Sequence, residues 1–335
     1  MKKILLILCV LCILCGGLPA QSKKILAAAD TIKELGNPHP QARLVAVTKA
    51  NMMQELADAD AVIGTVTPEM VRAGKNLKWV QVMSAGVENV LFKSSGNDLR
   101  DSNIVLTNNQ IVQGPEIADH AMAMLLYLSR SLNVYNAAKA KEEWPRMRFP
   151  GIELAGRNAL VIGCGGIGTQ ISMRAWAHGM NVTCVDPEDI PYNPFMKRVV
   201  KPDQLDAVIP EADVVFISAP HTPMSNKMVG PGQFEKMKKG AYFIAVSRGG
   251  IYDLNALVKA LDEKRLTGAG VDVTDPEPLP KGHPLWKFDN VVITPHIAGR
   301  SDKDHARMIG TIQDNIRRFC EGKPLINVVD KQKGY

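Results

Sequence analysis

The sequence lacks the compositional extremes that mark fibrous or disordered proteins. Aromatic residues make up only 5% of the 335 residues, and the 27 glycines and 21 prolines are spread along the chain without a low-complexity tract. Hydrophobic residues account for 46% and charged residues for 22%, which is typical of folded domains. This composition excludes a disordered or collagen-like chain, and the length predicts about two domains.

Cysteine is also scarce in the body of the chain. Three of the six cysteines fall within the first twenty residues, and the other three are widely spaced: Cys164, Cys184 and Cys320. An odd number without a Cys-x-x-Cys pair argues against a disulfide framework, and the seven histidines do not form a ligand pattern with carboxylates. We therefore expect buried free thiols and no metal site.

Clustered positive charge is missing as well. Lysine and arginine exceed aspartate and glutamate by 40 to 34, but no run of five basic residues occurs and no basic stretch alternates with aromatics. A nucleic-acid surface needs such a concentration of positive charge. We expect no nucleic-acid partner.

The one long hydrophobic run lies at the start of the chain. Lys2 and Lys3 precede an apolar run from Ile4 to Cys15, and small residues follow up to Ala20. This is a signal-peptide pattern, and twelve residues are too few to cross about 30 Å of hydrocarbon. We predict a signal peptide over residues 1–20, cleavage before Gln21 and export to the periplasm or medium, with no other membrane contact. A cytoplasmic protein is the alternative.

Short apolar runs alternate with helical patterns from Arg157 onward. Strands alternating with helices indicate a parallel sheet covered on both faces. The six predicted strands are 158–163, 181–185, 213–218, 241–246, 268–273 and 290–294, and the helices between them include 167–178, 231–239 and 254–264.

A second, smaller α/β unit is predicted upstream, with strands at 43–47, 61–64, 78–83 and 103–107. An opening strand is not evident around 24–35, and 118–141 is predicted to be one long helix. After Thr294, 41 residues remain, enough for one helix at about 303–320 that we expect to return to the first unit. The predicted domains are the signal peptide 1–20, a first part 21–109, a nucleotide-binding domain 110–297 and a returning segment 298–335.

A glycine loop follows the strand that ends near Ile162. Gly163, Gly165 and Gly168 form G-x-G-x-x-G between this strand and a helix, which is the arrangement that binds the pyrophosphate of a dinucleotide. Asp186 follows the next strand and would accept hydrogen bonds from the adenosine ribose. Its charge would repel a 2′-phosphate, which favours NAD over NADP. A solvated acid at a strand end is the alternative for Asp186.

Three chemically distinct side chains follow later strands of the same sheet. Arg248, Glu277 and His296 come after strands 241–246, 268–273 and 290–294, so they should meet at the edge that holds the glycine loop. Arg248 would bind a carboxylate and polarise a carbonyl, His296 would exchange a proton, and Glu277 would orient the imidazole and favour its protonated form. The alternatives are a loop-capping arginine, a solvated glutamate and a hydrogen-bonded strand-end histidine.

These segments resemble the D-isomer-specific 2-hydroxyacid dehydrogenases over essentially the whole body of the chain. The resemblance implies a Rossmann-type doubly wound parallel sheet plus a smaller, discontinuous, flavodoxin-like α/β substrate domain. It also implies a homodimer formed through the cofactor domain, and a short form without a regulatory domain. The matching segments are Gly163–Gly168, Ala219–Ser225, Ser247–Gly249, Asp272–Leu279, His283–Trp286 and Thr294–His296.

The resemblance also assigns binding roles. Ala85, Gly86 and Val87 would offer backbone amides to the substrate carboxylate beside Arg248, and Asp272 would hold the nicotinamide carboxamide. The expected cofactor-binding residues are Gly163, Gly165, Gly166, Ile167, Gly168, Asp186, Ala219, Pro220, Ser225, Val246, Arg248, Asp272, His296 and Gly299.

Three positions bear on the branch of the family. Ala245 stands where relatives usually carry Asn, Asp119 stands where Glu is common, and Glu277 in place of Gln argues against the formate dehydrogenase branch. The sequence thus predicts an NAD-dependent reductase of small 2-keto acids, with glyoxylate or hydroxypyruvate expected. Pyruvate and phosphohydroxypyruvate stay open as substrates. The alternative function is a corepressor-like interaction module that binds NAD.

Overall fold

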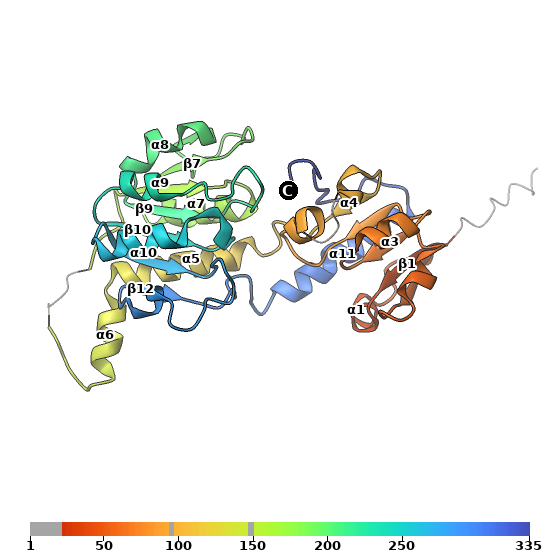
Figure 1. The fold of residues 1–335 in the computed structure, drawn as a ribbon, viewed down its shortest axis with the longest axis horizontal. Coiled ribbons are helices and arrows are strands. Elements are labelled where there is room, and N and C mark those ends of the chain that lie inside the picture. The colour runs from red at the N-terminus through yellow and green to blue at the C-terminus, as the bar shows by residue number, and fades with distance from the viewer. Residues whose placement is uncertain (1–21, 94–96, 147–150) are drawn as a thin grey trace, which may run out of the picture.

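The chain folds into two parallel sheets at opposite ends of an elongated molecule (Figure 1). The computed structural model describes residues 22–93, 97–146 and 151–335, so the predicted signal peptide lies outside the described residues. No helix in these ranges combines the length and apolar character needed to cross a membrane. The α/β fold class predicted from the sequence is confirmed.

The first sheet has the strand order β2-β1-β3-β4-β5, which is the flavodoxin-like order. Helices α2, α3 and α4 cover one face, and α1 and α11 cover the other. The elements are β1 (Lys23–Ala27), α1 (Ala29–Leu35), β2 (Ala42–Ala46), α2 (Met52–Leu56), β3 (Ala61–Ile63), α3 (Pro68–Ala73), β4 (Trp79–Gln81), α4 (Asp98–Asp101) and β5 (Val105–Thr107).

Strand β1 was not evident in the sequence, yet it lies inside this sheet between β2 and β3. The reason is Lys24, a charged residue that the fold buries to 7% exposure. Its ammonium pairs with Glu55 at 2.8 Å and with Asp58, and these carboxylates offset the cost of burial. The two lysines at the start of β1 suggest a segment exposed to solvent, but β1 is a strand of the core.

The second sheet has the order β12-β11-β10-β9-β6-β7-β8, all parallel, with the direction of winding changing between β6 and β9. Helices α5 and α7 cover one face, and α8, α9 and α10 cover the other. The elements are α5 (Gly114–Ser129), α6 (Leu132–Lys139), β6 (Asn158–Ile162), α7 (Gly166–Ala177), β7 (Asn181–Val185), β8 (Arg198–Val200), α8 (Leu205–Val208), β9 (Val214–Ile217), α9 (Pro231–Lys236), β10 (Ala241–Ala245), α10 (Leu254–Asp262), β11 (Leu266–Val271) and β12 (Val291–Ile293).

Two expectations for this part of the chain were wrong. The sheet has a seventh strand, β8, which is three half-exposed edge residues and too short for a sequence pattern. The long helix expected over 118–141 is divided into α5 and α6. Ser131 adopts a left-handed φ of 56°, and the Ile152 amide donates to the Ser129 carbonyl at 2.7 Å, which takes an acceptor that a continuing helix would use.

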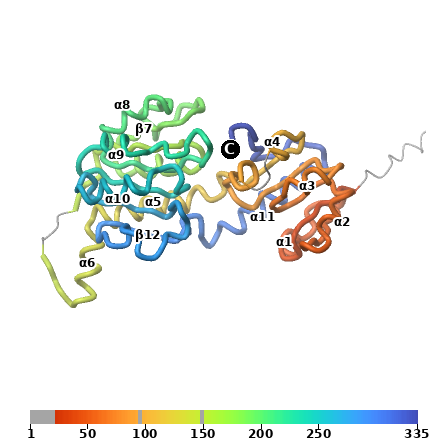
Figure 2. Tube along the Cα trace, viewed as in Figure 1, coloured from red at the N-terminus to blue at the C-terminus, as the bar shows by residue number. Residues whose placement is uncertain are grey.

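Helix α11 (Asp304–Cys320) belongs to the first sheet although it follows the second one along the chain. Figures 1 and 2 show it running from the second sheet to the underside of the first. Ile309, Ile312 and Ile316 are buried there against Ile25 and Trp79. The first unit is therefore built from two separate stretches of the chain.

We expect Ile312→Ala to lower the free energy of unfolding by about 2–5 kcal/mol, because Ile312 is fully buried and its truncation leaves a cavity between α11 and the sheet. Urea unfolding followed by tryptophan fluorescence measures the loss. Val105→Ala, at a position 37% exposed in the same unit, is the control and should cost under about 0.5 kcal/mol. Equal effects of the two substitutions would contradict the placement of α11.

Candidate active site

The glycine loop between β6 and α7 is shaped to receive an anion. Gly163 has a φ of 90°, and a Cβ on Gly168 would overlap the Gly163 carbonyl, so the helix packs directly on the strand end. Gly165 faces open space, and no side chain caps the start of α7. Free amides at a helix start bind phosphate groups. The residues present therefore fit the pyrophosphate of a dinucleotide, with Gly166 and Ile167 in the first turn.

Asp186 lies at the end of β7, beside this loop. It is 7% exposed, and its carboxylate accepts hydrogen bonds from the Cys164 amide at 2.6 Å and from the Glu188 amide at 2.9 Å. These bonds fix the acid at the position where an adenosine ribose would lie. The placement fits the expected role, with the remaining lone pairs of the carboxylate available to ribose hydroxyls.

The other expected cofactor residues follow β9, β10 and β12. Ala219 packs so closely on Gly163 that a Cβ there would overlap it, and Val246 is buried. The Ser225 hydroxyl donates to the Pro220 carbonyl at 2.6 Å and accepts from the Thr222 amide, so it fixes the turn after β9. Its expected contact with the cofactor stays a prediction.

The loop that follows β12 is also held in place, by a hydrogen bond from a side chain to its backbone. The Gly299 carbonyl accepts a hydrogen bond from Gln113 at 2.8 Å, and a Cβ on Gly299 would crowd that amide. This bond ties the loop that follows His296 to the start of α5.

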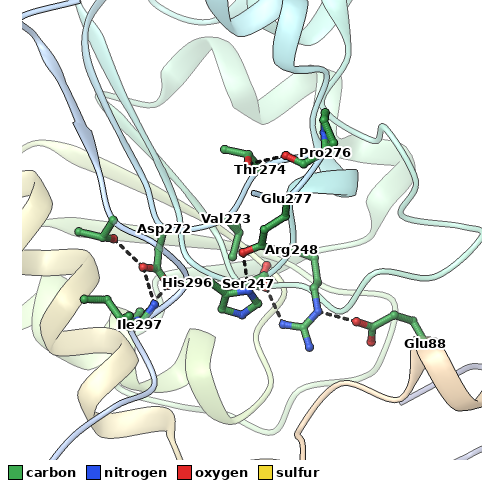
Figure 3. A network of polar contacts seen from close by, with 12 residues as sticks. Glu88, Ser247, Arg248, Asp272, Val273, Thr274, Pro276, Glu277, His296 and Ile297 are labelled. Atoms are coloured by element: carbon green, nitrogen blue, oxygen red, sulfur yellow. Dashed lines mark hydrogen bonds and ion pairs between the residues drawn. The ribbon is translucent and has the colours of Figure 1, made fainter. Parts of the chain in front are cut away.

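Arg248 follows β10 and reaches across to the first unit. Its Nε donates to Glu88 Oε1 at 2.6 Å, and its Nη1 donates to the Ser247 carbonyl at 2.8 Å (Figure 3). The third nitrogen, Nη2, lies against Gly86 and makes no hydrogen bond within the described chain. The guanidinium is thus held in place with one nitrogen left for a ligand.

Glu88 is a site residue that the sequence analysis did not single out. Burial opposes its ionisation, but the Arg248 guanidinium outweighs this and holds the pKa of Glu88 below its ordinary value. The carboxylate is therefore charged at neutral pH and positions Arg248. The sequence held one signal for Glu88, namely its position directly after Ala85, Gly86 and Val87, which were expected to bind the substrate.

The loop of Ala85, Gly86 and Val87 lies where the two units meet. The Ser84 hydroxyl donates to the Gly86 carbonyl at 2.6 Å, and Asn108 donates to the Ala85 carbonyl at 2.7 Å. Val87 is buried in the core of the first unit. The structure thus brings this loop together with Arg248.

We expect Gly86→Ala to raise the KM for substrate by about tenfold or more, because its Cβ would overlap the Arg248 guanidinium and displace the carboxylate-binding nitrogen. The Kd for NADH should stay within about twofold, since the substitution is remote from the glycine loop. Steady-state kinetics and fluorescence titration measure the two values. Gly232→Ala, where a Cβ meets nothing within 4 Å, is the matched control. An unchanged KM would remove the Gly86 loop from the substrate site.

His296 and Glu277 form a hydrogen-bonded pair. His296 Nδ1 lies 2.8 Å from Glu277 Oε1, and both side chains are about two-fifths exposed, at 42% and 39%. Figure 3 shows the imidazole between Glu277 and the Arg248 guanidinium. His296 adopts a left-handed φ of 55°, and its amide donates to the Asp272 carbonyl at 2.8 Å. Because Nδ1 is bound to the carboxylate, Nε2 is the ring nitrogen that can meet a substrate.

Asp272 holds the loop that carries His296. Its side chain is fully buried, and its carboxylate accepts hydrogen bonds from the Thr294 hydroxyl and from the Ile297 and Ala298 amides (Figure 3). The expected contact of Asp272 with a nicotinamide carboxamide stays a prediction. The three N–H and O–H donors explain why an acid is buried here.

The structure also places the two departures from the family pattern. Asp119, on α5, accepts a hydrogen bond from Arg174 on α7 at 2.6 Å, and Ala245 is fully buried at the end of β10. Ser247, two residues later, has a buried hydroxyl with no partner in the described part of the chain.

Two hollows on the surface of the second unit, one beside Tyr242 and one beside Asn181, lie at the opposite, amino-terminal edge of the sheet. Over residues 22–93, 97–146 and 151–335, no group of three or more His, Cys, Asp or Glu is placed to hold a metal.

The chain is similar in sequence to known proteins. Residues 122–298 match the family model described as D-isomer specific 2-hydroxyacid dehydrogenase, NAD binding domain. The chain is 31% identical to a D-3-phosphoglycerate dehydrogenase of Archaeoglobus fulgidus over 85% of its own length, but it spans only 54% of that relative. It is 30% identical to a glyoxylate reductase of Korarchaeum cryptofilum, covering 85% of this chain and 87% of the relative.

A solved structure has the same fold. The D-isomer specific 2-hydroxyacid dehydrogenase of Xanthobacter autotrophicus, in complex with NADPH and MES, superposes with a TM-score of 0.79 at 24% identity, over 94% of this chain and all of that one. The family model covers more than half of the chain, and the glyoxylate reductase is matched over most of its length. The chain therefore belongs to the D-isomer-specific 2-hydroxyacid dehydrogenase family.

Proposed function

We propose that this chain is an NAD-dependent reductase of small 2-keto acids, acting on glyoxylate, hydroxypyruvate or a close analogue. The observation that carries the proposal is the meeting of Arg248 with the His296–Glu277 pair beside the Gly86 loop (Figure 3). A cation for a carboxylate and an acid for a carbonyl oxygen are what the reduction of a 2-keto acid requires.

Substrate binding falls to the residues at the junction of the two units. Arg248 Nη2 would bind the substrate carboxylate, and backbone amides of the Ala85–Val87 loop would complete the contact. Glu88 holds the guanidinium in place by accepting from Nε at 2.6 Å, so little reorganisation is needed when the substrate arrives. The nicotinamide, when bound, supplies the hydride to the carbonyl carbon.

The proton is the task of His296 and Glu277. His296 Nε2 would donate to the carbonyl oxygen as it gains negative charge, and Glu277 would hold Nδ1 and stabilise the imidazolium before transfer. In the reverse direction the neutral imidazole takes the proton from the hydroxyl. Asp272 supports this step by fixing the loop through the Ile297 and Ala298 amides.

Glu88 also bears on the choice of substrate. Its carboxylate lies beside the cation that would receive the substrate, and its side chain is 14% exposed. A second anionic group on the substrate would meet this charge, which disfavours phosphorylated keto acids. Glyoxylate and hydroxypyruvate carry only the carboxylate, so we place them ahead of phosphohydroxypyruvate.

The preference for NAD over NADP is part of the proposal. Asp186, Glu188 and Asp189 put three acids in the segment after β7, where a 2′-phosphate would lie. Lys201 pairs with Asp189 at 2.7 Å and Lys333 pairs with Glu188 at 2.6 Å, but Asp186 has no lysine or arginine partner in the described chain and keeps its negative charge uncompensated. Like-charge repulsion therefore supports NAD.

The test is a panel of glyoxylate, hydroxypyruvate, pyruvate and phosphohydroxypyruvate with NADH and with NADPH, followed by the loss of reduced-cofactor absorbance. We expect turnover with NADH and the two small unphosphorylated acids. Binding of NADH without turnover of any keto acid would instead support the corepressor-like interaction module, and neither binding nor turnover would refute both functions.

Assembly and location are further parts of the proposal. We propose a homodimer, supported by apolar side chains exposed on the arm around α6, with Trp144 at 86% and Leu132 at 46% exposure. Analytical ultracentrifugation tests it, and a monomer at micromolar concentration would contradict it.

We also propose export by the leader over residues 1–20. Cell fractionation and sequencing of the mature amino terminus test this. An intact Met1 on the protein in the cytoplasmic fraction would contradict export.

A further inference from the structure

Residues Asp330–Tyr335 form a compact loop, here named the bridging loop. The Asp330 amide donates to the Tyr335 carbonyl at 3.0 Å, and the Gly334 amide donates to the Asp330 carbonyl at 2.8 Å. The Asp330 carboxylate also accepts from the Gln332 and Lys333 amides. These bonds give the loop a fixed shape before it meets anything else.

The bridging loop is anchored in the first unit by Lys331. Its Nζ donates to the carbonyls of Leu99, Ser102 and Ile104, at 3.0, 2.5 and 2.8 Å, where α4 ends and the chain turns into β5. Burial lowers the pKa of Lys331, which is the expected response of an ammonium held mainly by carbonyl groups. The loop therefore moves with the first unit.

The other side of the bridging loop contacts the second unit. Lys333 Nζ lies 2.6 Å from Glu188 Oε1, and the Tyr335 hydroxyl donates to the same oxygen at 2.9 Å. Gly334 fits between the units, since a Cβ there would overlap the Phe92 ring and come within 3.5 Å of Thr222. Figures 1 and 2 show the chain end between the two sheets.

The contacts lie on the loops that follow β7 and β9, the two strands that flank β6. Glu188 follows β7 and donates its amide to Asp186, while Thr222 follows β9 and lies beyond Ala219 and Pro220. In a doubly wound sheet the adenosine half of a dinucleotide lies between these two loops. The Tyr335 hydroxyl lies 2.9 Å from Glu188, and burial, this hydrogen bond and the nearby negative charges raise the pKa of Tyr335.

We propose that the bridging loop forms the outer wall of the adenosine subsite, with Lys333 and Tyr335 as positioning residues that hold Glu188 and the segment beside Asp186. This inference rests on the proposed function, because it assumes that a dinucleotide binds at the glycine loop. Under this proposal, affinity for the adenosine half of the cofactor depends on the bridging loop, which belongs to the first unit. Separation of the two units would therefore open the adenosine subsite.

The size of the effect follows from the exposure of the pair. Lys333 and Glu188 are 49% and 43% exposed, so the ion pair by itself contributes little. The hydrogen bond from Tyr335 to the same charged oxygen adds to it, and the preformed loop has little conformational freedom left to lose. We expect a loss of about three- to tenfold in affinity on removal of either side chain.

The experiment is calorimetric titration of the full chain with ADP-ribose, which contains the adenosine, the pyrophosphate and the second ribose of the cofactor but no nicotinamide. Lys333→Ala, Tyr335→Phe and Glu188→Gln should each raise the Kd for ADP-ribose about three- to tenfold. Lys333→Ala combined with Glu188→Gln should be no weaker than the single variants, because both remove the same contact. Lys333→Arg should restore most of the affinity.

The control is Lys323→Ala. Lys323 forms a comparable ion pair with Glu321, at 2.7 Å and with exposures of 64% and 38%, but both partners lie in the same unit. It should leave the Kd unchanged. Thermal melting without ligand identifies any variant that loses stability.

Three outcomes would overturn the inference. Wild-type affinity in all variants, or additive losses in the double variant, would show that the contact does not support the subsite. Tighter binding in the variants would show that the loop obstructs it. A wild-type chain that binds neither ADP-ribose nor NADH would instead refute the proposed function on which the inference rests.

Discussion

Replacing His296 with alanine is expected to lower kcat by about 10²- to 10⁴-fold, the range for loss of a general acid. The imidazole is the group that Glu277 orients and that lies next to the guanidinium of Arg248. Without it, the carbonyl oxygen would gain negative charge without receiving the proton that the imidazole supplies. The Kd for NADH should stay within about threefold, because the glycine loop is untouched.

Steady-state kinetics with glyoxylate and fluorescence titration with NADH measure the two effects. His305→Ala is the matched control, since His305 also pairs with a glutamate, Glu34 at 3.1 Å, and is 53% exposed on α11. It should retain full activity. A fall of less than tenfold for His296→Ala would mean that another group supplies the proton.

Arg248→Lys is expected to lower kcat/KM by about 10²-fold or more, through both turnover and substrate affinity. The guanidinium binds Glu88 with Nε and the Ser247 carbonyl with Nη1, and it still has Nη2 for the substrate. A single ammonium cannot hold Glu88 and a substrate carboxylate in the same fixed geometry. Lysine would therefore remain with Glu88 and leave the substrate poorly bound.

Kinetics with the preferred keto acid test this prediction, with Arg198→Lys as the control for a surface arginine that pairs with Glu211 at 2.7 Å. Normal KM in Arg248→Lys would show that another cation binds the carboxylate. Arg72 and Arg100, in the first unit, are then the first candidates.

The meeting of the candidate site residues could be predicted because its signals are local. Gly163–Gly168 combines a strand, a turn and a helix within a few residues, and Arg248, Glu277 and His296 each follow a strand whose carboxyl end faces the same edge. The parallel topology then brings the residues together, without any knowledge of side-chain contacts.

The remaining features depend on contacts between distant residues. Glu88 becomes part of the site only because Arg248, 160 residues later, reaches it, and Lys24 can be buried only because Glu55 and Asp58 meet its ammonium. The part that Asp272 plays in fixing the His296 loop could not be predicted, because a sequence shows the residue type and not its partners. In the structure, the Ile297 and Ala298 amides donate to its carboxylate.

The return of α11 to the first sheet has a consequence for biosynthesis. Trp79 on β4 emerges from the ribosome more than two hundred residues before Ile312, a delay of roughly ten to fifty seconds at about 5–20 residues per second. During this time the apolar face of the first sheet that includes Ile25 and Trp79 lacks α11, one of the two helices that cover it. The first sheet is synthesised first, but its core is completed last. The second sheet is contiguous in the chain and can already have folded by then. At this stage the nascent chain exposes an apolar face of the first sheet to chaperones.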